Sequence, residues 1–280
     1  MKQINPHELA TLLEKAIPSL AFDLPADVVL ALKKAQNHET HFRAQVVLDH
    51  LIKNTSIAKH DQVPICQDTG SVWLCLEIGP DVLVSGDVFS QVDSAVARAY
   101  AQAGLRTSLV YDSLCDRTNT GNNTPAFCEV YMSEKPGARL HIMLKGGGSD
   151  NASRLVMLPP ASGKQGIIDE LLRCVEEKAA NACAPVIIGL GIGATFDKVA
   201  GLAKRALMRT IDEKNPNPRL ADFEEELCEL VNASGVGPGG LGGNTTALAV
   251  KVNTAPSHIA AFPLAINMGC SAMRRKTIEL

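Results

Sequence analysis

This sequence of 280 residues contains few aromatic side chains and no excess of charge of either sign. Phe, Trp and Tyr together make up 4% of it, which argues against the stacking surfaces that bind single-stranded nucleic acid. Lys and Arg number 27 and Asp and Glu number 30, so the net charge of −3 excludes a generally basic nucleic-acid-binding protein. It also lacks an uncharged apolar run of about 18 residues. We therefore expect no nucleic acid and no membrane among its partners.

Two further absences concern the location of the protein and the state of its cysteines. The segment from Met1 to Glu8 has no apolar core of the signal-peptide type, so we expect a cytoplasmic protein. In that compartment the eight cysteines are thiols or ligands rather than disulfides. None of them forms a C-x-x-C pair, which argues against a zinc ribbon or a thioredoxin-like site.

The hydrophobic pattern predicts an α+β fold in which helices precede a mixture of strands and helices. A chain of this length buries enough apolar surface to fold without disulfides or metals. Apolar residues at helical spacing predict a helical region over about residues 1–60. Beyond it we expect strands at 72–78, 126–132, 140–144, 186–188, 246–252 and 259–266, and helices at 87–103, 167–182, 195–208 and, after a polar break at 215–218, up to about 231. With no internal repeat and no long linker, residues 1–280 are expected to form one compact domain.

Glycine is concentrated in three clusters, at 146–148, 189–193 and 235–243, which suggests a pocket lined by backbone as well as turns. The middle cluster and Ala194 fit G-x-G-x-x-A between an apolar strand and a helix, as in dinucleotide-binding folds. The acidic pair Asp212-Glu213 follows about 20 residues later, but no predicted strand carries it. Nucleotide binding is therefore kept as an alternative, and the cluster predicts backbone N–H groups placed for an anion at a helix start.

Other catalytic motifs are missing. His38 and His41 are three residues apart, whereas the two histidines of a zinc protease are four apart, so we interpret this segment as a solvated helix start. The sequence contains neither a G-x-S-x-G elbow nor a Walker A motif.

Three cysteines differ from the others in their surroundings. Cys66, Cys183 and Cys270 lie near Gly or Pro at the ends of predicted elements, where ligands to a shared cofactor are often found. Four others fall inside predicted strands or helices and are interpreted as small core residues: Cys75, Cys128, Cys174 and Cys228. The pattern assigns no role to Cys115.

Several motifs, in this order, resemble those of the class I, iron–sulfur-dependent fumarate hydratases and their tartrate dehydratase relatives. They are Cys66-Gln67-Asp68-Thr69-Gly70, Asn119-Thr120-Gly121-Asn122-Asn123-Thr124-Pro125, Lys145-Gly146-Gly147-Gly148-Ser149-Asp150-Asn151, Cys183-Ala184-Pro185 leading into 189–193, Gly237-Pro238-Gly239-Gly240-Leu241-Gly242-Gly243, and Cys270 twelve residues after His258. Each motif is short, but their shared order extends over about 200 residues.

The resemblance implies a [4Fe–4S] cluster that is bound by Cys66, Cys183 and Cys270 and leaves one iron without a protein ligand. Thiolates are the usual ligands of such clusters, and an open iron can act as a Lewis acid. The implied reaction is the reversible hydration of fumarate to malate. Negative charge builds up on a substrate carboxylate in this reaction, and iron, cationic groups and backbone donors can stabilise it.

The resemblance also assigns roles to individual side chains. Asp68 and His258 are the implied catalytic residues, with Asp68 handling the proton and His258 able to hydrogen-bond the substrate. Arg106 matches an arginine that binds a substrate carboxylate through two hydrogen bonds. The remaining implied substrate-binding residues are Gln67, Asn122, Gly146, Gly147 and Gly148.

The match covers only the N-terminal part of single-chain family members, so the resemblance implies an α subunit. A β subunit would complete the active site, most simply in an α₂β₂ assembly, and the N-terminal helices could form an α–α contact. The segment from Lys145 to Asn151 favours fumarate over tartrate, while mesaconate and other dicarboxylates stay open. A non-catalytic iron–sulfur protein is the alternative of another class, and the presence of both Asp68 and His258 argues against it.

Overall fold

The computed structural model describes residues 2–280, and its backbone contacts divide the chain into two compact units. The first unit consists of Met1–Pro25, Thr55–Gly147 and Arg274–Leu280, and the second of Ala26–Asn54 and Gly148–Met273. One compact domain over residues 1–280 stays a prediction. Each unit is assembled from separate stretches of the chain, so no linker or change of composition marks a boundary between them.

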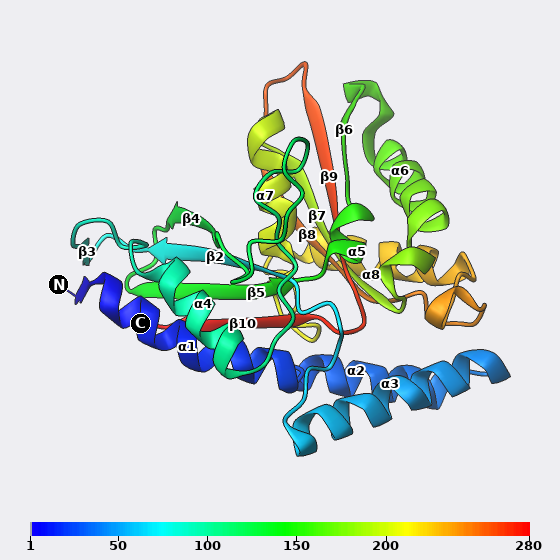
Figure 1. Ribbon diagram of the computed structural model, residues 1–280. Helices are drawn as coiled ribbons and strands as arrows, with labels where there is room; N and C mark the ends of the chain where they lie inside the picture. Colours follow the sequence, from blue (N-terminus) through cyan, green and yellow to red (C-terminus); the bar gives the residue numbers. More distant parts are fainter. Residues whose placement is uncertain (1) are drawn as a thin grey trace. The chain divides into compact units, whose positions relative to one another are not determined.

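The first unit is built on a four-stranded sheet with the order β10-β5-β2-β4 (Figure 1). Its strands are β2 (Ser71–Ile78), β4 (Phe127–Met132), β5 (Ala138–Lys145) and β10 (Arg274–Glu279). Strand β5 pairs antiparallel with β2 and β10, and β4 pairs parallel with β2. Two short strands, β1 (Lys2–Ile4) and β3 (Val82–Val84), form a separate parallel pair.

Helices α1 (Pro6–Phe22) and α4 (Val92–Gln102) pack on one face of this sheet. Alternate residues of β2, beginning with Val72 and Leu74, point into that core, as the period of a strand requires. Helix α1 begins at a favourable cap, because the Asn5 side chain accepts a hydrogen bond from the backbone N–H of Glu8 (3.0 Å). Most of the predicted site residues of this unit lie on loops at the end of the sheet where β2 begins.

The second unit contains a four-stranded sheet with the order β6-β9-β7-β8. Its strands are β6 (Arg154–Leu158), β7 (Val186–Gly193), β8 (Ala247–Ala255) and β9 (Phe262–Gly269), with β7 parallel to β8 and antiparallel to β9. Helices α2 (Ala26–His38), α6 (Gly163–Lys178), α7 (Phe196–Ala206) and α8 (Pro218–Ala233) belong to this unit, whereas α3 (Phe42–Asp61) and α5 (Gly147–Asn151) each contain residues of both units. Helices α6 and α8 pack on one face of the sheet, and α7 packs on the other. Single 3₁₀ turns occupy Pro160–Ser162, Ala180–Ala182 and Pro238–Gly240.

The glycines at 189–193 lie inside strand β7 rather than in a loop, which corrects the G-x-G-x-x-A interpretation. Ile188 and Leu190 face the core beneath α6 and α8, whereas Gly189 and Gly191 face α7. A Cβ atom on Gly189 would lie 2.3 Å from the Ala203 carbonyl oxygen, and one on Gly191 would lie 2.3 Å from that of Val199. These glycines therefore allow α7 to pack closely on the sheet, and they form no anion-binding helix start.

The predicted α+β class and the helical start of the chain are confirmed, with α1, α2 and α3 filling most of residues 1–60. The prediction missed the short strands β1, β3, β6 and β10. It was also wrong about Cys128, which is exposed on the edge strand β4 rather than in the core. Among the described residues, no helix is long and apolar enough to cross a membrane.

The segment around His38 and His41 starts helix α3, as predicted, but its glutamate is not solvated. Glu39 is 3% exposed, and its carboxylate accepts hydrogen bonds from the backbone N–H groups of Thr40 and His41 (both 3.0 Å) and of Asn244 (2.8 Å). Glu39 therefore connects the start of α3 to the glycine-rich turn at 235–243.

Candidate functional site

The loop between α3 and β2 carries three of the predicted site residues. Its backbone is anchored where the Ile65 N–H donates to the Ala21 carbonyl oxygen at the end of α1 (2.9 Å). Cys66, the next residue, is partly buried and unbridged, and Gln67 is exposed. The loop thus holds a thiol and an amide at its surface on a fixed backbone.

Asp68 is held by backbone hydrogen bonds on both oxygens of its carboxylate. Oδ1 accepts from the Gly70 N–H (3.1 Å), and Oδ2 accepts from the Gly147 N–H (2.8 Å). The second bond brings the Lys145–Asn151 motif to the Cys66–Gly70 motif within the first unit. A Cβ atom on Gly146 would lie 3.1 Å from Asp68 Oδ2, so the carboxylate lies directly against this glycine.

The loops that carry Arg106 and Asn123 form hydrogen bonds with Thr69 and Gly70. The Thr69 hydroxyl donates to the Arg106 carbonyl oxygen (2.5 Å), and the Asn123 amide donates to the Gly70 carbonyl oxygen (3.1 Å). Gly70 has φ = +84°, and a Cβ atom there would lie 2.8 Å from the carbonyl carbon of Lys145. Only glycine fits this backbone, because a side chain would meet both the strained φ and the neighbouring strand.

The structure brings Arg106 and Asn122 to the same set of loops but gives them different surroundings. Arg106 is exposed, and no described residue forms a hydrogen bond or an ion pair with its guanidinium, which leaves it free to bind an anion. Asn122 is exposed too, but its Oδ1 accepts from the backbone N–H and the hydroxyl of Thr124 (3.1 and 2.8 Å). Its amide therefore stabilises a local turn.

Asn123, which the sequence analysis did not single out, is the fully buried residue of this motif. It is 0% exposed and adopts φ = +60°. Besides its bond to Gly70, its Oδ1 accepts from the Ser108 N–H (2.8 Å), so one side chain joins the loops that carry Arg106 and Asp68. A signal was present in the sequence, since asparagine tolerates the left-handed region better than most residues, but neighbouring Asn122 shares that property.

Tyr100 forms hydrogen bonds with the same loops. This residue of α4 is 1% exposed, and its hydroxyl contacts the carbonyl oxygens of Gly70 (2.9 Å) and Thr69 (3.3 Å). Burial raises the pKa of Tyr100 to about 12; nearby Arg274 acts against this rise and the Asp68 carboxylate adds to it. The phenol therefore remains a hydrogen-bond donor at neutral pH.

In the second unit, the loops of Cys183 and Cys270 lie side by side at one end of the sheet. The Ser271 N–H donates to the Cys183 carbonyl oxygen (3.2 Å), and the Gly239 N–H donates to the carbonyl oxygen of Ala184 (2.8 Å). Cys183 is exposed and has φ = +57°, while Cys270 is partly buried. The glycine-rich turn at 235–243 thus packs beside the Cys183 loop.

Gly148 belongs to this same end of the second unit. A Cβ atom placed on it would lie 3.4 Å from the carbonyl oxygen of Asn181, two residues before Cys183. Two of the three glycine clusters therefore adjoin predicted cysteine loops, and the cluster inside β7 does not.

The chemistry of the three loop thiols fits an iron–sulfur cluster. Cys66, Cys183 and Cys270 are unbridged and at least partly exposed on loops, whereas Cys75 and Cys174 are buried in the cores. Burial raises the pKa of the Cys174 thiol, which disfavours the thiolate that a metal requires. Within either unit, the described residues form no group of three or more His, Cys, Asp or Glu side chains that could hold a metal ion. The shared cluster therefore stays a prediction.

His258 lies at the opposite end of the second unit's sheet from Cys183 and Cys270. It occupies the exposed turn between β8 and β9, where the Ala260 N–H donates to its Nδ1 (3.1 Å). Cys270 follows the far end of the eight-residue strand β9, which is roughly 25 Å long. The structure therefore does not bring His258 to the two cysteines of its own chain.

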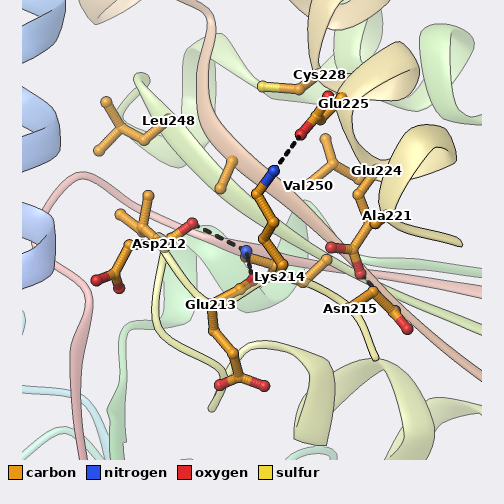
Figure 2. A pocket seen from close by; sticks show the side chains of 13 residues that line it. Asp212, Glu213, Lys214, Asn215, Ala221, Glu224, Glu225, Cys228, Leu248 and Val250 are labelled. Carbon is orange, nitrogen blue, oxygen red and sulfur yellow. Dashed lines mark hydrogen bonds and ion pairs between the residues drawn. The ribbon is translucent and has the colours of Figure 1, made fainter. Parts of the chain in front are cut away.

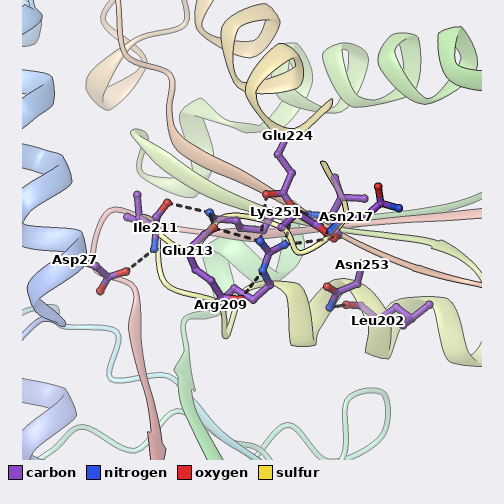
Figure 3. Close-up of polar contacts among 11 residues, drawn as sticks. Asp27, Leu202, Arg209, Ile211, Glu213, Asn217, Glu224, Lys251 and Asn253 are labelled. Carbon is purple, nitrogen blue, oxygen red and sulfur yellow. Dashed lines mark hydrogen bonds and ion pairs between the residues drawn. The ribbon is translucent and has the colours of Figure 1, made fainter. Parts of the chain in front are cut away.

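A polar network of the second unit lies away from all of these residues. Lys251 is 5% exposed, and its Nζ donates to the carbonyl oxygens of Ile211 (2.9 Å) and Glu213 (2.6 Å), while Arg209 pairs with Glu224 (2.5 Å) (Figure 3). Burial lowers the pKa of Lys251. This network fastens the loop after α7 onto β8.

A cavity of about 270 Å³ lies beside this network, between the loop after α7, helix α8 and strand β8 (Figure 2). Asp212 and Glu213 line it, and Lys214 faces Glu225 across it (3.8 Å). The acidic pair thus lies in a clamped loop rather than at a strand end, which is where the acidic residue of a dinucleotide site lies. Together with the strand position of the glycines, this removes the basis of the nucleotide-binding alternative.

These features define an α+β protein whose chemically reactive side chains gather on loops at strand ends. A family model described as Fumarate hydratase (Fumerase) matches residues 10–279, so the chain belongs to the fumarate hydratase (Fumerase) family. The resemblance seen in the motifs is thereby confirmed.

Curated relatives match over nearly the whole chain. The sequence is 36% identical to a putative L(+)-tartrate dehydratase subunit alpha of Methanocaldococcus jannaschii, over 93% of this chain and 94% of that protein. It is 29% identical to the L(+)-tartrate dehydratase subunit alpha of Escherichia coli K12, over 99% of this chain and 92% of that protein. The subunit of the same name from Shigella boydii is also 29% identical, with the same coverage.

Proposed function

We propose that this chain is the α subunit of an iron–sulfur hydro-lyase that adds water to, or removes water from, a small dicarboxylate. Membership of the fumarate hydratase family supports the class of reaction. The observation that carries the proposal is the convergence of the Asp68, Arg106 and Gly147 loops on Thr69 and Gly70. This arrangement holds an exposed cation and a carboxylate on one rigid backbone.

The roles of these side chains follow from the chemistry of hydration. Hydration of fumarate forms one C–O and one C–H bond, and the reverse reaction removes a proton from the carbon next to a carboxylate. Arg106, exposed and unpaired, suits a substrate carboxylate, and Gln67 can donate a hydrogen bond to it. Asp68, positioned by two backbone N–H groups, is the proposed proton carrier. A bound cluster with an open iron would supply Lewis-acid stabilisation of the oxygen that is added or lost.

Fumarate is the first candidate substrate and L(+)-tartrate the second. The Lys145–Asn151 motif favours fumarate, whereas the names of the curated relatives favour tartrate. The test is an anaerobic assay of the cluster-reconstituted chain, with and without a β subunit of the same family, using both substrates in parallel. Turnover of fumarate above tartrate is expected, and the reverse preference would assign the tartrate reaction.

A β subunit is proposed as partner because the predicted substrate-binding residues offer too little positive charge for a dianion. Only Arg106 among them is cationic, whereas two substrate carboxylates require more positive charge, since buried charges must be paired. Activity is therefore expected only in the mixed complex. Equal turnover by the α chain alone would show that the active site is not divided between subunits.

The cluster assignment is tested by replacing its proposed ligands one at a time. Cys66→Ser, Cys183→Ser and Cys270→Ser should each lower the iron content and abolish turnover, whereas Cys174→Ser, at a buried core thiol, should retain the cluster. Removal of iron by a chelator should abolish activity, and ferrous iron with thiol should restore it. Full activity of the iron-free complex would refute the proposal.

The position of His258 gives the proposed assembly a specific requirement. Because it lies at the far end of β9 from Cys183 and Cys270, any role on substrate must be played in the site of another copy of this chain. A His258→Ala chain and a Cys183→Ser chain, mixed in equal amounts, should then restore up to about a quarter of the activity. About half of the α–α pairs are then mixed, and one of the two sites in each mixed pair is intact. Absence of complementation, with each variant inactive alone, would remove His258 from the list of substrate ligands.

A further inference from the structure

Arg274 is a buried cation that the proposed function has not used. It begins strand β10 directly opposite Leu144 on β5, so its side chain lies on the face of the sheet that α1 and α4 cover. The residue is 1% exposed. Its Nε and Nη1 atoms are enclosed and find no hydrogen-bond partner among the described residues, and no carboxylate of residues 2–280 forms an ion pair with it.

Burying an unpaired guanidinium of this kind lowers the stability of the fold. A buried charge without a counter-ion loses its hydration and gains nothing in return, so buried cations are normally paired. The chain nevertheless places this arginine at the end of the sheet nearest the predicted site loops of the first unit. An anion that is not part of the described chain would account for it.

The third guanidinium nitrogen, Nη2, indicates where that anion would bind. A Cβ atom placed on Gly146 would lie 3.7 Å from Arg274 Nη2 and 3.1 Å from Asp68 Oδ2. The cation and the carboxylate therefore approach the same glycine without forming an ion pair. Both charges also act on the Tyr100 hydroxyl beneath the loops, which places them in one electrostatic environment.

We infer that Arg274 is a positioning residue that supplies a positive charge beneath the Gly146–Gly147 turn and so favours binding of a dianionic substrate over a monoanionic one. Nε and Nη1 are enclosed, so these two atoms act through the field across the turn rather than by contact. This inference rests on the proposed function, since it assumes a dicarboxylate bound beside Asp68. It adds a second cation to the one supplied by Arg106.

The test compares dianion and monoanion binding by the cluster-reconstituted complex. Succinate, which is unreactive, and propionate serve as probes in titration calorimetry, alongside KM and kcat for fumarate and tartrate. Arg274→Met should weaken succinate binding roughly tenfold, which corresponds to about 1.4 kcal/mol, and propionate binding by less than about threefold. The KM for the dicarboxylate should rise more than kcat falls, and Arg274→Lys should restore most of the succinate affinity.

Arg274→Gln removes the positive charge but keeps a side chain that can donate hydrogen bonds. It also provides a second charge-free variant in case Arg274→Met fails to fold. It should behave like Arg274→Met. The matched control is Arg275→Met, which removes the neighbouring buried arginine on the opposite face of the same strand and should leave the succinate-to-propionate ratio unchanged. Wild-type affinity for succinate in Arg274→Gln, equal losses for both probes, or no succinate binding by the wild type would overturn the inference. Succinate selectivity without turnover of either substrate would instead refute the proposed reaction alone.

Discussion

Replacement of Asn123 by alanine should destabilise the first unit and disconnect the loops that carry Arg106 and Asp68. The change removes hydrogen bonds to Gly70 (3.1 Å) and from Ser108 (2.8 Å), each worth about 1 kcal/mol net. It also places alanine at φ = +60°, which costs roughly 1 kcal/mol more than asparagine there. The expected loss is therefore about 3 kcal/mol of unfolding free energy.

The protein contains its own reporter for this measurement. Its single tryptophan, Trp73, is 4% exposed on β2 of the first unit, so urea unfolding followed by its fluorescence reports on that unit. Asn122→Ala is the matched control, because this exposed neighbour only stabilises a local turn and should cost less than about 1 kcal/mol. In the complex with the β subunit, Asn123→Ala should also lower kcat/KM at least about tenfold. A loss of stability in Asn122→Ala equal to or larger than that in Asn123→Ala would refute the reasoning.

Two predictions concern stability alone. Burial by itself raises the pKa of Glu77, but hydrogen bonds, chiefly from Arg139, outweigh it and lower this pKa to about 2, so the pair stabilises the fold above pH 4.5 and loses its effect as the pH falls from there toward 2. Between pH 5 and pH 3 the wild type should lose about 2 kcal/mol more unfolding free energy than Glu77→Gln, and parallel pH profiles would contradict the assignment. Gly191→Ala should cost about 3 kcal/mol or prevent folding, since its Cβ would lie 2.3 Å from a backbone oxygen of α7. Gly201→Ala, within α7 itself, should be neutral or stabilising by up to about 1 kcal/mol, because its Cβ would meet only the end of a flexible arginine side chain at 3.4 Å; thermal unfolding of the two variants checks this contrast.

The order of helices and strands could be predicted where the signal is local. The apolar run within Ser71–Ile78 and the helical spacing along Pro6–Phe22 are properties of neighbouring residues, and the structure has β2 and α1 at these places. Strand β10 was missed because Arg274–Glu279 is mostly polar. Its first two residues, both arginines, are buried in a sheet whose neighbouring strand β5 is far away in the sequence, and no local pattern reports such burial.

The same limit applies to the glycine clusters. Gly189–Gly193 has the spacing of a phosphate-binding loop, yet its glycines serve the packing of α7 on β7. Glycine at these positions means that something approaches closely, and the sequence cannot say whether it is a ligand or a helix. Only the pairing of β7 with β8 and β9 decides between them.

The sequence by itself determined the family, the α+β class and the identity of the loop thiols, because these depend on residue types in a fixed order along the chain. The tertiary structure decided which of those residues meet. It joined the loops of Asp68, Arg106 and Gly147 at Gly70, placed Cys183 beside Cys270, and separated His258 from both by the length of β9. The physical reason is that hydrogen bonds and packing between segments far apart in sequence set these distances, whereas a motif records only the spacing of residues along the chain.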